Sequence, residues 1–159
     1  MAKVHPAIKH YFRRLTVFLL ALTLLRFSFF IQNKVAFAQA GFSEILKSFA
    51  AGVYFDFIYS FYALIPIMVL LLIASYLLRF RTVRWVESIY FIAITLVSTV
   101  LACIDAAYFP FVKSHIGADL IFFLDGENNI SLWTYIFQYW HLLILCLGLP
   151  FLAWWLSGR

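Results

Sequence analysis

Charged residues and cysteines are scarce in this sequence of 159 residues. Asp, Glu, Lys and Arg together make up 12% of the chain, whereas hydrophobic residues make up 65%. A water-soluble domain of this size needs more polar surface than that to cover its apolar residues, so the composition excludes one. The two cysteines, Cys103 and Cys146, fall within apolar runs and therefore indicate neither a disulfide framework nor a zinc site.

Catalytic signatures are also lacking. The sequence contains no phosphate-binding loop, no GxSxG turn and no HExxH motif. It also lacks the pair of acidic motifs with which a membrane alcohol phosphotransferase would hold metal ions. We therefore expect no catalytic, cofactor-binding or metal-binding residue in this chain. We expect its net charge of +5 to reflect the orientation of a membrane protein rather than the binding of a nucleic acid.

The sequence does contain four long apolar runs, at about residues 15–32, 59–78, 88–109 and 135–156. Each run is close to the ~20 residues with which a helix crosses ~30 Å of hydrocarbon. The mean hydropathy of +0.96 agrees with this interpretation. The sequence therefore predicts an all-α integral membrane protein in which residues 1–159 form a single domain of four transmembrane helices.

The distribution of basic residues predicts the orientation of these helices. Lys and Arg gather before the first run, between the second and third runs, and after the fourth, which predicts that these segments are cytoplasmic. Both termini are then cytoplasmic, and the two longer connections face the outside. A multi-pass protein of the bacterial cytoplasmic membrane is expected. The inner basic residues are Lys3, Lys9, Arg13, Arg14, Arg79, Arg81, Arg84 and Arg159.

A cleaved signal peptide is an alternative interpretation of the first run. A basic region, an apolar stretch and the small-residue segment 36–40 follow one another in the order that such peptides have. Arg26 interrupts the apolar stretch, however, and Gln32, Asn33 and Lys34 place the cleavage point far downstream. These residues favour a membrane-spanning helix.

The two outer connections are more apolar than simple loops. Between residues 41 and 53, apolar residues recur at helical spacing, with Ser43 in the position of an N-cap. Residues 118–124 are again apolar, and Asp125 with Gly126 indicates a turn. We expect a short helix in each connection, lying in the outer interface of the membrane.

Three ionisable residues lie at or within the predicted membrane segments, where charge is costly. They are Arg26 in the first run, Asp56 near the start of the second and Asp105 near the end of the third. All three are expected near the outer face, where they could meet in one layer. Two interpretations stay open. The residues either lock the helices together or form a pocket for an anionic lipid headgroup, with Arg26 as the phosphate partner.

Two further polar features are expected to have structural roles. Gln138 and His141 are one turn apart in the fourth run and could hydrogen-bond across the bundle. Arg79, Arg81 and Arg84, with Glu87, form a cytoplasmic anchor that favours anionic lipids.

Two longer segments resemble a known family. They are GVYFDFIYSFYALIPIMVLLL, residues 52–72, and ACIDAAYFPFVKSHIGADLIFFL, residues 102–124. Together they are similar to the amino-terminal membrane region of bacterial lipoteichoic acid synthase-like phosphoglycerol transferases, of the sulfatase and alkaline phosphatase superfamily. The resemblance consists of a Gly-x-x-Phe-Asp motif, an Asp-x-x-Tyr-Phe motif and a Gly-Ala-Asp segment, and it extends to the arginine in the first run. The motif residues are Gly52, Phe55, Asp56, Asp105, Tyr108, Phe109, Gly117, Ala118 and Asp119.

The resemblance implies a role for the chain as part of a larger enzyme. Members of that family carry a fifth membrane helix and a large extracytoplasmic domain with a catalytic threonine and a divalent metal, commonly manganese. Neither part lies within residues 1–159, so what the resemblance implies for this chain is a membrane domain that anchors such a catalytic domain and gives it access to a phospholipid donor. The alternative is a free-standing small membrane protein, either a transporter subunit or a structural partner that assembles through its helices.

Overall fold

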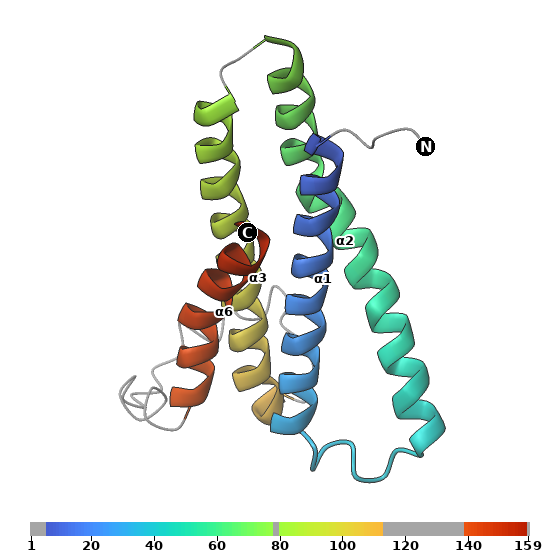
Figure 1. Cartoon of the computed structure of the whole chain (residues 1–159). Helices are drawn as coiled ribbons and strands as arrows, with labels where there is room; N and C mark the ends of the chain where they lie inside the picture. Colours follow the sequence, from blue (N-terminus) through green and yellow to red (C-terminus); the bar gives the residue numbers. More distant parts are fainter. Residues whose placement is uncertain (1–5, 78–79, 113–138, 159) are drawn as a thin grey trace.

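The computed structural model in Figure 1 describes residues 6–77, 80–112 and 139–158. These residues form four helices, and helices that follow one another in the chain run antiparallel (Figure 1). All four are long and apolar enough to cross a membrane, so the predicted all-α membrane fold class is confirmed. The helices are α1 (Pro6–Gln32), α2 (Phe42–Leu77), α3 (Phe80–Val112) and α6 (Trp140–Gly158).

The helices extend beyond the apolar runs that predicted them. Helix α1 begins nine residues before its run, at Pro6, whose fixed φ suits the first position of a helix. The segment 41–53, which we expected to be a separate helix, is the first part of α2 instead. Its cap is Gly41 rather than Ser43, because the Gly41 amide donates to Glu44 Oε2 over 3.1 Å and the Glu44 amide donates back to the Gly41 carbonyl.

Some predictions lie outside the described residues. They are the second interfacial segment 118–124, the turn at residues 125–126, the start of the predicted fourth helix and the side chain of Gln138.

Most apolar residues of the bundle face outward. In the most apolar window of each helix, between 17% and 28% of the residues are buried inside the bundle. A soluble protein rarely exposes so much continuous apolar surface, whereas a bilayer covers it. The outward face of the bundle is therefore a lipid-facing surface.

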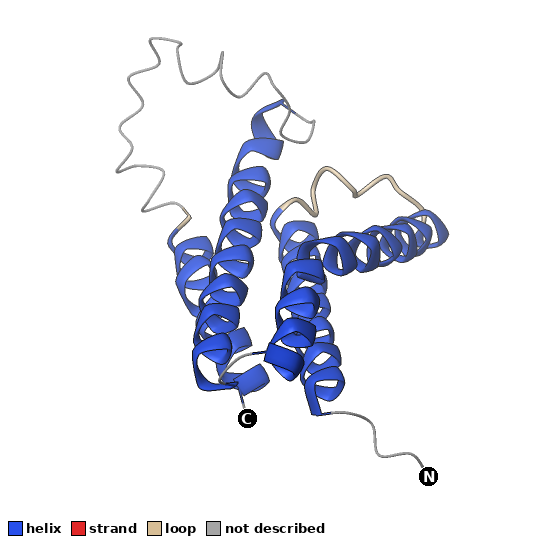
Figure 2. Cartoon of the chain, turned by 90° about the horizontal axis from the view of Figure 1, so that it is seen from above, coloured by secondary structure: helices blue, strands red, loops and turns tan. Residues whose placement is uncertain are grey.

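The two ends of the bundle differ in how tightly the helices pack. At the hairpin end, where Leu77 and Phe80 mark the junction of α2 and α3, the two helices rise beyond the carboxyl end of α6 (Figure 1). At the loop end, where residues 33–41 join α1 to α2, the first part of α2 leans away from α1 in both views (Figures 1 and 2). The main core lies between these regions and contains Tyr11, Leu15, Phe18, Leu64, Ile67, Leu71, Phe91 and Ala153.

Candidate functional site

Two polar contacts join α6 to α1, one near each end of α6. They provide reference levels from which the depth of other residues along the bundle axis can be counted. His141 Nε2 lies 2.6 Å from Gln32 Oε1 near the start of α6, and Arg14 Nη1 donates to Ser157 Oγ over 2.6 Å near its end. At 1.5 Å per residue, the α6 stretch rises about 24 Å and the α1 stretch about 27 Å. The two contacts therefore enclose a layer close to the ~30 Å thickness of the hydrocarbon core.

Arg26 lies inside this layer. It is six residues, or about 9 Å, from Gln32, and twelve residues, or about 18 Å, from Arg14. A charged side chain at that depth needs a partner, because hydrocarbon solvates it poorly. Arg26 is therefore in the half of the layer that belongs to the loop end.

Asp56 of α2 is that partner. Arg26 Nε donates to Asp56 Oδ2 over 3.2 Å, and Arg26 Nη2 donates to Asp56 Oδ1 over 2.8 Å. This is the two-pronged geometry in which a guanidinium and a carboxylate match best. The Asp56 side chain is 14% exposed and that of Arg26 is 34% exposed, so the pair is sheltered but reachable.

Gly52 makes room for the guanidinium. Its carbonyl accepts a hydrogen bond from Arg26 Nη2 over 3.2 Å. A Cβ atom at this position would collide with the guanidinium of Arg26, so any larger residue would push the arginine out of place. Gly52 and Asp56 are one turn apart on α2, and both accept hydrogen bonds from Arg26. The glycine is thus required by close approach rather than by backbone conformation.

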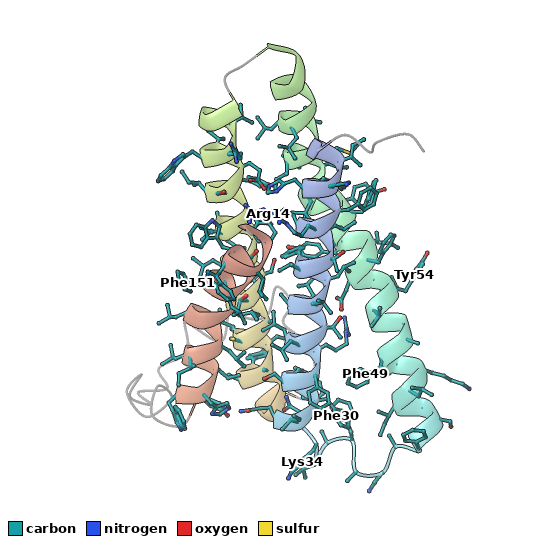
Figure 3. The ribbon with its side chains drawn as sticks, in the orientation of Figure 1. Arg14, Phe30, Lys34, Phe49, Tyr54 and Phe151 are labelled. Atoms are coloured by element: carbon teal, nitrogen blue, oxygen red, sulfur yellow. The ribbon has the colours of Figure 1, made fainter. Side chains whose placement is uncertain are left out.

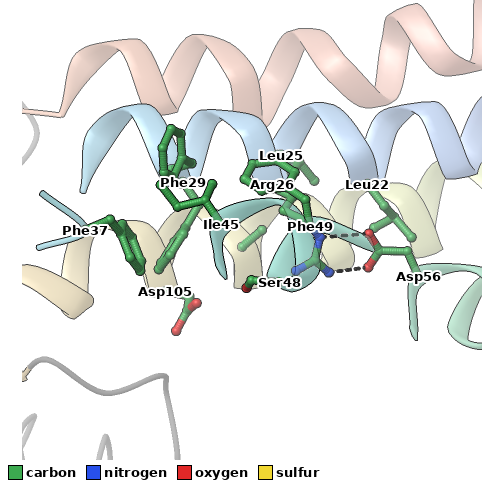
Figure 4. A pocket seen from close by; sticks show the side chains of 12 residues that line it. Leu22, Leu25, Arg26, Phe29, Phe37, Ile45, Ser48, Phe49, Asp56 and Asp105 are labelled. Carbon is green, nitrogen blue, oxygen red and sulfur yellow. Dashed lines mark hydrogen bonds and ion pairs between the residues drawn. The ribbon is translucent and has the colours of Figure 1, made fainter. Parts of the chain in front are cut away.

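A cavity of about 270 Å³ opens beside the ion pair, between α1, α2 and α3 (Figure 4). Its polar groups are Arg26, Asp56, Ser48 and Asp105, and the rest of its wall is apolar. Asp105 lines the cavity but lies at a distance from the ion pair in Figure 4. The Asn33 amide donates to the Ala106 carbonyl over 3.4 Å, which places Asp105 nearer the loop end than Arg26. The cavity therefore holds all three predicted residues, in two layers.

Aromatic rings close the cavity toward the loop end. Phe30 of α1 and Phe49 of α2 point toward one another across the gap (Figure 3), with ring centres 5.5 Å apart in an edge-to-face arrangement. Phe37 of the loop stacks on Phe109 of α3 at 5.9 Å, and Phe29 contacts Phe109 at 5.0 Å. These contacts join the helices where α2 leans outward, so the ion pair lies behind a wall of rings.

A second ionic cluster, which we did not predict, is buried between α1, α3 and α6. Arg14 Nε lies 2.8 Å from Glu87 Oε1, and Arg14 Nη2 donates to Glu87 Oε2 over 3.1 Å. His10 Nε2 is 3.2 Å from the same Oε2 atom. The Arg14 and Glu87 side chains are 1% and 0% exposed. Both residues lie outside the stretches that hydropathy predicts as spanning or at their edge, yet each lies inside a helix, Arg14 in α1 and Glu87 in α3.

Arg14 has further partners besides Glu87. Arg14 also donates to Ser157 Oγ and Ser88 Oγ, and its guanidinium lies 4.3 Å above the centre of the Phe91 ring. A buried ion pair needs such additional partners to offset its desolvation. A sequence signal for this burial exists, because Arg14 shares the helical face of Tyr11, Phe18, Ala21 and Leu25, which are all buried. The cluster ties three helices together.

The described residues contain no group of three or more His, Cys, Asp and Glu side chains that could hold a metal ion. Comparisons with known proteins give no further assignment: no protein-family model, no curated protein and no solved structure matches this chain.

Proposed function

We propose that this chain is the membrane domain of a phosphoglycerol transferase-like envelope enzyme, which anchors its catalytic domain and admits a phospholipid donor at the outer face of the bacterial cytoplasmic membrane. The cavity beside Arg26 is then the place where the lipid headgroup is held. The hairpin end is cytoplasmic and the loop end faces outward, in keeping with the positions of the basic residues.

One observation carries this proposal. Three features of the family resemblance, namely Gly52, Asp56 and the arginine of the first helix, come together as a single structural unit around the Arg26 guanidinium. Asp105, from the second motif, lines the cavity that this unit borders. Residues that lie far apart in the sequence thus border one pocket. This supports the proposal that they bind the same ligand.

The chemistry of the pocket suits a headgroup that carries both phosphate and hydroxyl groups. The Nε and Nη2 groups of Arg26 are used by Asp56 and Gly52, whereas the two N–H groups of Nη1 have no acceptor among the described residues. A phosphate oxygen can accept from Nη1. Headgroup hydroxyls can donate to the carboxylates of Asp56 and Asp105, since a carboxylate offers about four lone-pair sites. The combination favours a phosphoglycerol over a bare phosphate.

The size and depth of the cavity agree with this ligand. A volume of about 270 Å³ holds a headgroup but not a whole lipid. The acyl chains would stay in the bilayer, against the apolar outer face of the helices. Arg26 is about 9 Å from the level of Gln32, so the phosphate would sit inside the outer half of the layer, and the Phe30–Phe49 contact would shield it from water.

The test is retention of phosphatidylglycerol by the purified chain, measured by native mass spectrometry after release from nanodiscs. Arg26→Lys keeps the charge but loses the forked geometry, and should lower retention by about tenfold, the equivalent of one charge-assisted hydrogen bond. Lys34→Ala is the matched control, because Lys34 is an exposed cation at the same end of the bundle. It should retain the lipid as well as the parent protein.

Two results would contradict the proposal. Equal retention by Arg26→Lys and the parent would show that the guanidinium does not hold the headgroup. Equal loss in Arg26→Lys and Lys34→Ala would show that only general electrostatic attraction is at work. Either result would favour the alternative, a free-standing helix bundle in which Arg26 and Asp56 serve only to lock α1 to α2.

A further inference from the structure

Besides the Arg26 cavity, a groove of about 460 Å³ lies between α3 and α6, in the half of the bundle that belongs to the hairpin end. Five of its lining residues come from α3 and one, Trp154, from α6. It is separate from the Arg26 cavity and shares no lining residue with it. The α3 residues are Arg84, Trp85, Ser88, Ile89 and Ile92.

The α3 residues of the groove change from polar to apolar along the helix. Arg84, Ser88 and Ile92 are four residues apart and therefore share one face of α3, and Trp85 and Ile89 form a second row beside them. The first row spans about 12 Å. The order cation, hydroxyl, alkyl matches the order of groups from the headgroup of a phospholipid into its acyl chain.

The depth of the groove agrees with this order. Ser88 contacts Arg14, which is level with the end of α6, at the boundary of the layer defined above. Arg84 lies one turn, or about 6 Å, beyond this boundary, and Ile92 lies one turn inside it. Trp85 is 69% exposed and Trp154 borders the groove at the end of α6, where tryptophans at a bilayer interface are expected.

The polar groups of the groove are available to a ligand. Arg84 is exposed and makes no ion pair or hydrogen bond with any described residue. Ser88 Oγ accepts a hydrogen bond from Arg14 Nη2 over 3.1 Å, and the acceptor for its own proton is Glu87 Oε2 at 3.5 Å, the limit of hydrogen-bonding distance. A phosphate oxygen in the groove would take that proton at a better distance and would neutralise Arg84.

We infer that the groove between α3 and α6 binds an anionic phospholipid, with its phosphate on Arg84 and Ser88 and an acyl chain along Ile89, Ile92 and Trp154. The site lies on the half of the bundle away from the Arg26 cavity and does not depend on the function proposed for that cavity. It would hold a lipid as a lasting structural partner of α3 and α6 rather than as a substrate.

The two tryptophans of the groove provide a local readout. In the full chain, Trp133, Trp140 and Trp155 are replaced by Phe, so that fluorescence comes from Trp85 and Trp154. The protein is placed in vesicles that contain dibrominated phosphatidylglycerol or dibrominated phosphatidylcholine, whose bromines quench nearby tryptophan. The relative strength of quenching gives the preference of this site for the anionic lipid. We expect a preference of about fivefold, the effect of one well-placed basic residue.

Arg84→Gln should abolish this preference. Lys9→Gln is the matched control, because Lys9 is an exposed cation at the same end of the bundle, and it should leave the preference unchanged. Ser88→Ala should reduce it partly. Equal quenching by the two lipids in the parent protein would overturn the inference, as would an equal loss in Arg84→Gln and Lys9→Gln. Competition by millimolar inorganic phosphate would also overturn it, because a lipid site needs the acyl chain.

Discussion

The buried pair of Arg14 and Glu87 allows a stability prediction with a definite magnitude. Glu87→Gln keeps the shape of the side chain but removes its charge, which leaves Arg14 buried at 1% exposure without a counter-ion. Breaking a buried ion pair in this way typically costs about 3–5 kcal/mol. The hydroxyls of Ser157 and Ser88 and the ring of Phe91 remain in contact with the guanidinium and offset part of the loss. We therefore expect a cost near the lower value, about 3 kcal/mol.

Reversible unfolding in bicelles, followed by steric trapping, measures this free energy. The double variant Arg14→Met with Glu87→Met removes both charges, and should be less destabilised than either single Met variant, because no unpaired charge is left. Lys9→Gln removes an exposed charge nearby and should change stability by less than about 0.5 kcal/mol. If Glu87→Gln were as mild as Lys9→Gln, or if the two Met substitutions were simply additive, the burial and coupling described here would be refuted.

Two further predictions test the packing of the helices. Gly52→Ala should destabilise the bundle by about 1–3 kcal/mol, because the new methyl group displaces the Arg26 guanidinium. In Gly148→Ala of α6, the new Cβ meets nothing within 4 Å. This substitution should be neutral or stabilising by up to about 1 kcal/mol in the same unfolding assay. A larger loss of stability in Gly148→Ala than in Gly52→Ala would refute the close approach at Gly52. The Cys103 thiol of α3 donates to the Leu142 carbonyl of α6 over 3.5 Å, and Cys146 follows Leu142 by one turn of α6. Dibromobimane, which fluoresces once it joins two thiols, should therefore link Cys103 to Cys146 in the intact protein but not in Cys146→Ala. No fluorescence in the parent would contradict this packing.

The four helices could be predicted from the sequence because hydrocarbon imposes a simple requirement. Each span needs about 20 apolar residues, and runs of that length are visible directly. The bounds could not be predicted in the same way. Helix α1 already includes His10 and Arg14 before its apolar run begins, and α3 begins before Glu87. The helices are therefore longer than the apolar runs that predict them. Polar residues in these extensions look like solvated flanks until their partners on other helices are known.

The candidate site was partly predictable for a related reason. Arg26 and Asp56 stand out because a lone charge in an apolar run requires a counter-ion, and the structure pairs them. The depth of Asp105 depends on how α3 meets the end of α1 through Asn33, which no local pattern reveals. The need for Gly52 likewise follows from the position of the Arg26 side chain, not from the sequence around the glycine.

The most direct test of a headgroup site at Arg26 is solid-state NMR of the protein in phosphatidylglycerol bilayers, with ¹⁵N-labelled arginine. The guanidinium signal of Arg26 is the one that disappears in Arg26→Lys, and its dephasing by lipid ³¹P reports whether a phosphate lies within a few ångströms. A phosphate held at Nη1 predicts strong dephasing of that signal, in phosphatidylglycerol but not in lipid whose headgroup lacks hydroxyls. No dephasing of the Arg26 signal, while exposed arginines such as Arg84 are dephased, would contradict the headgroup site.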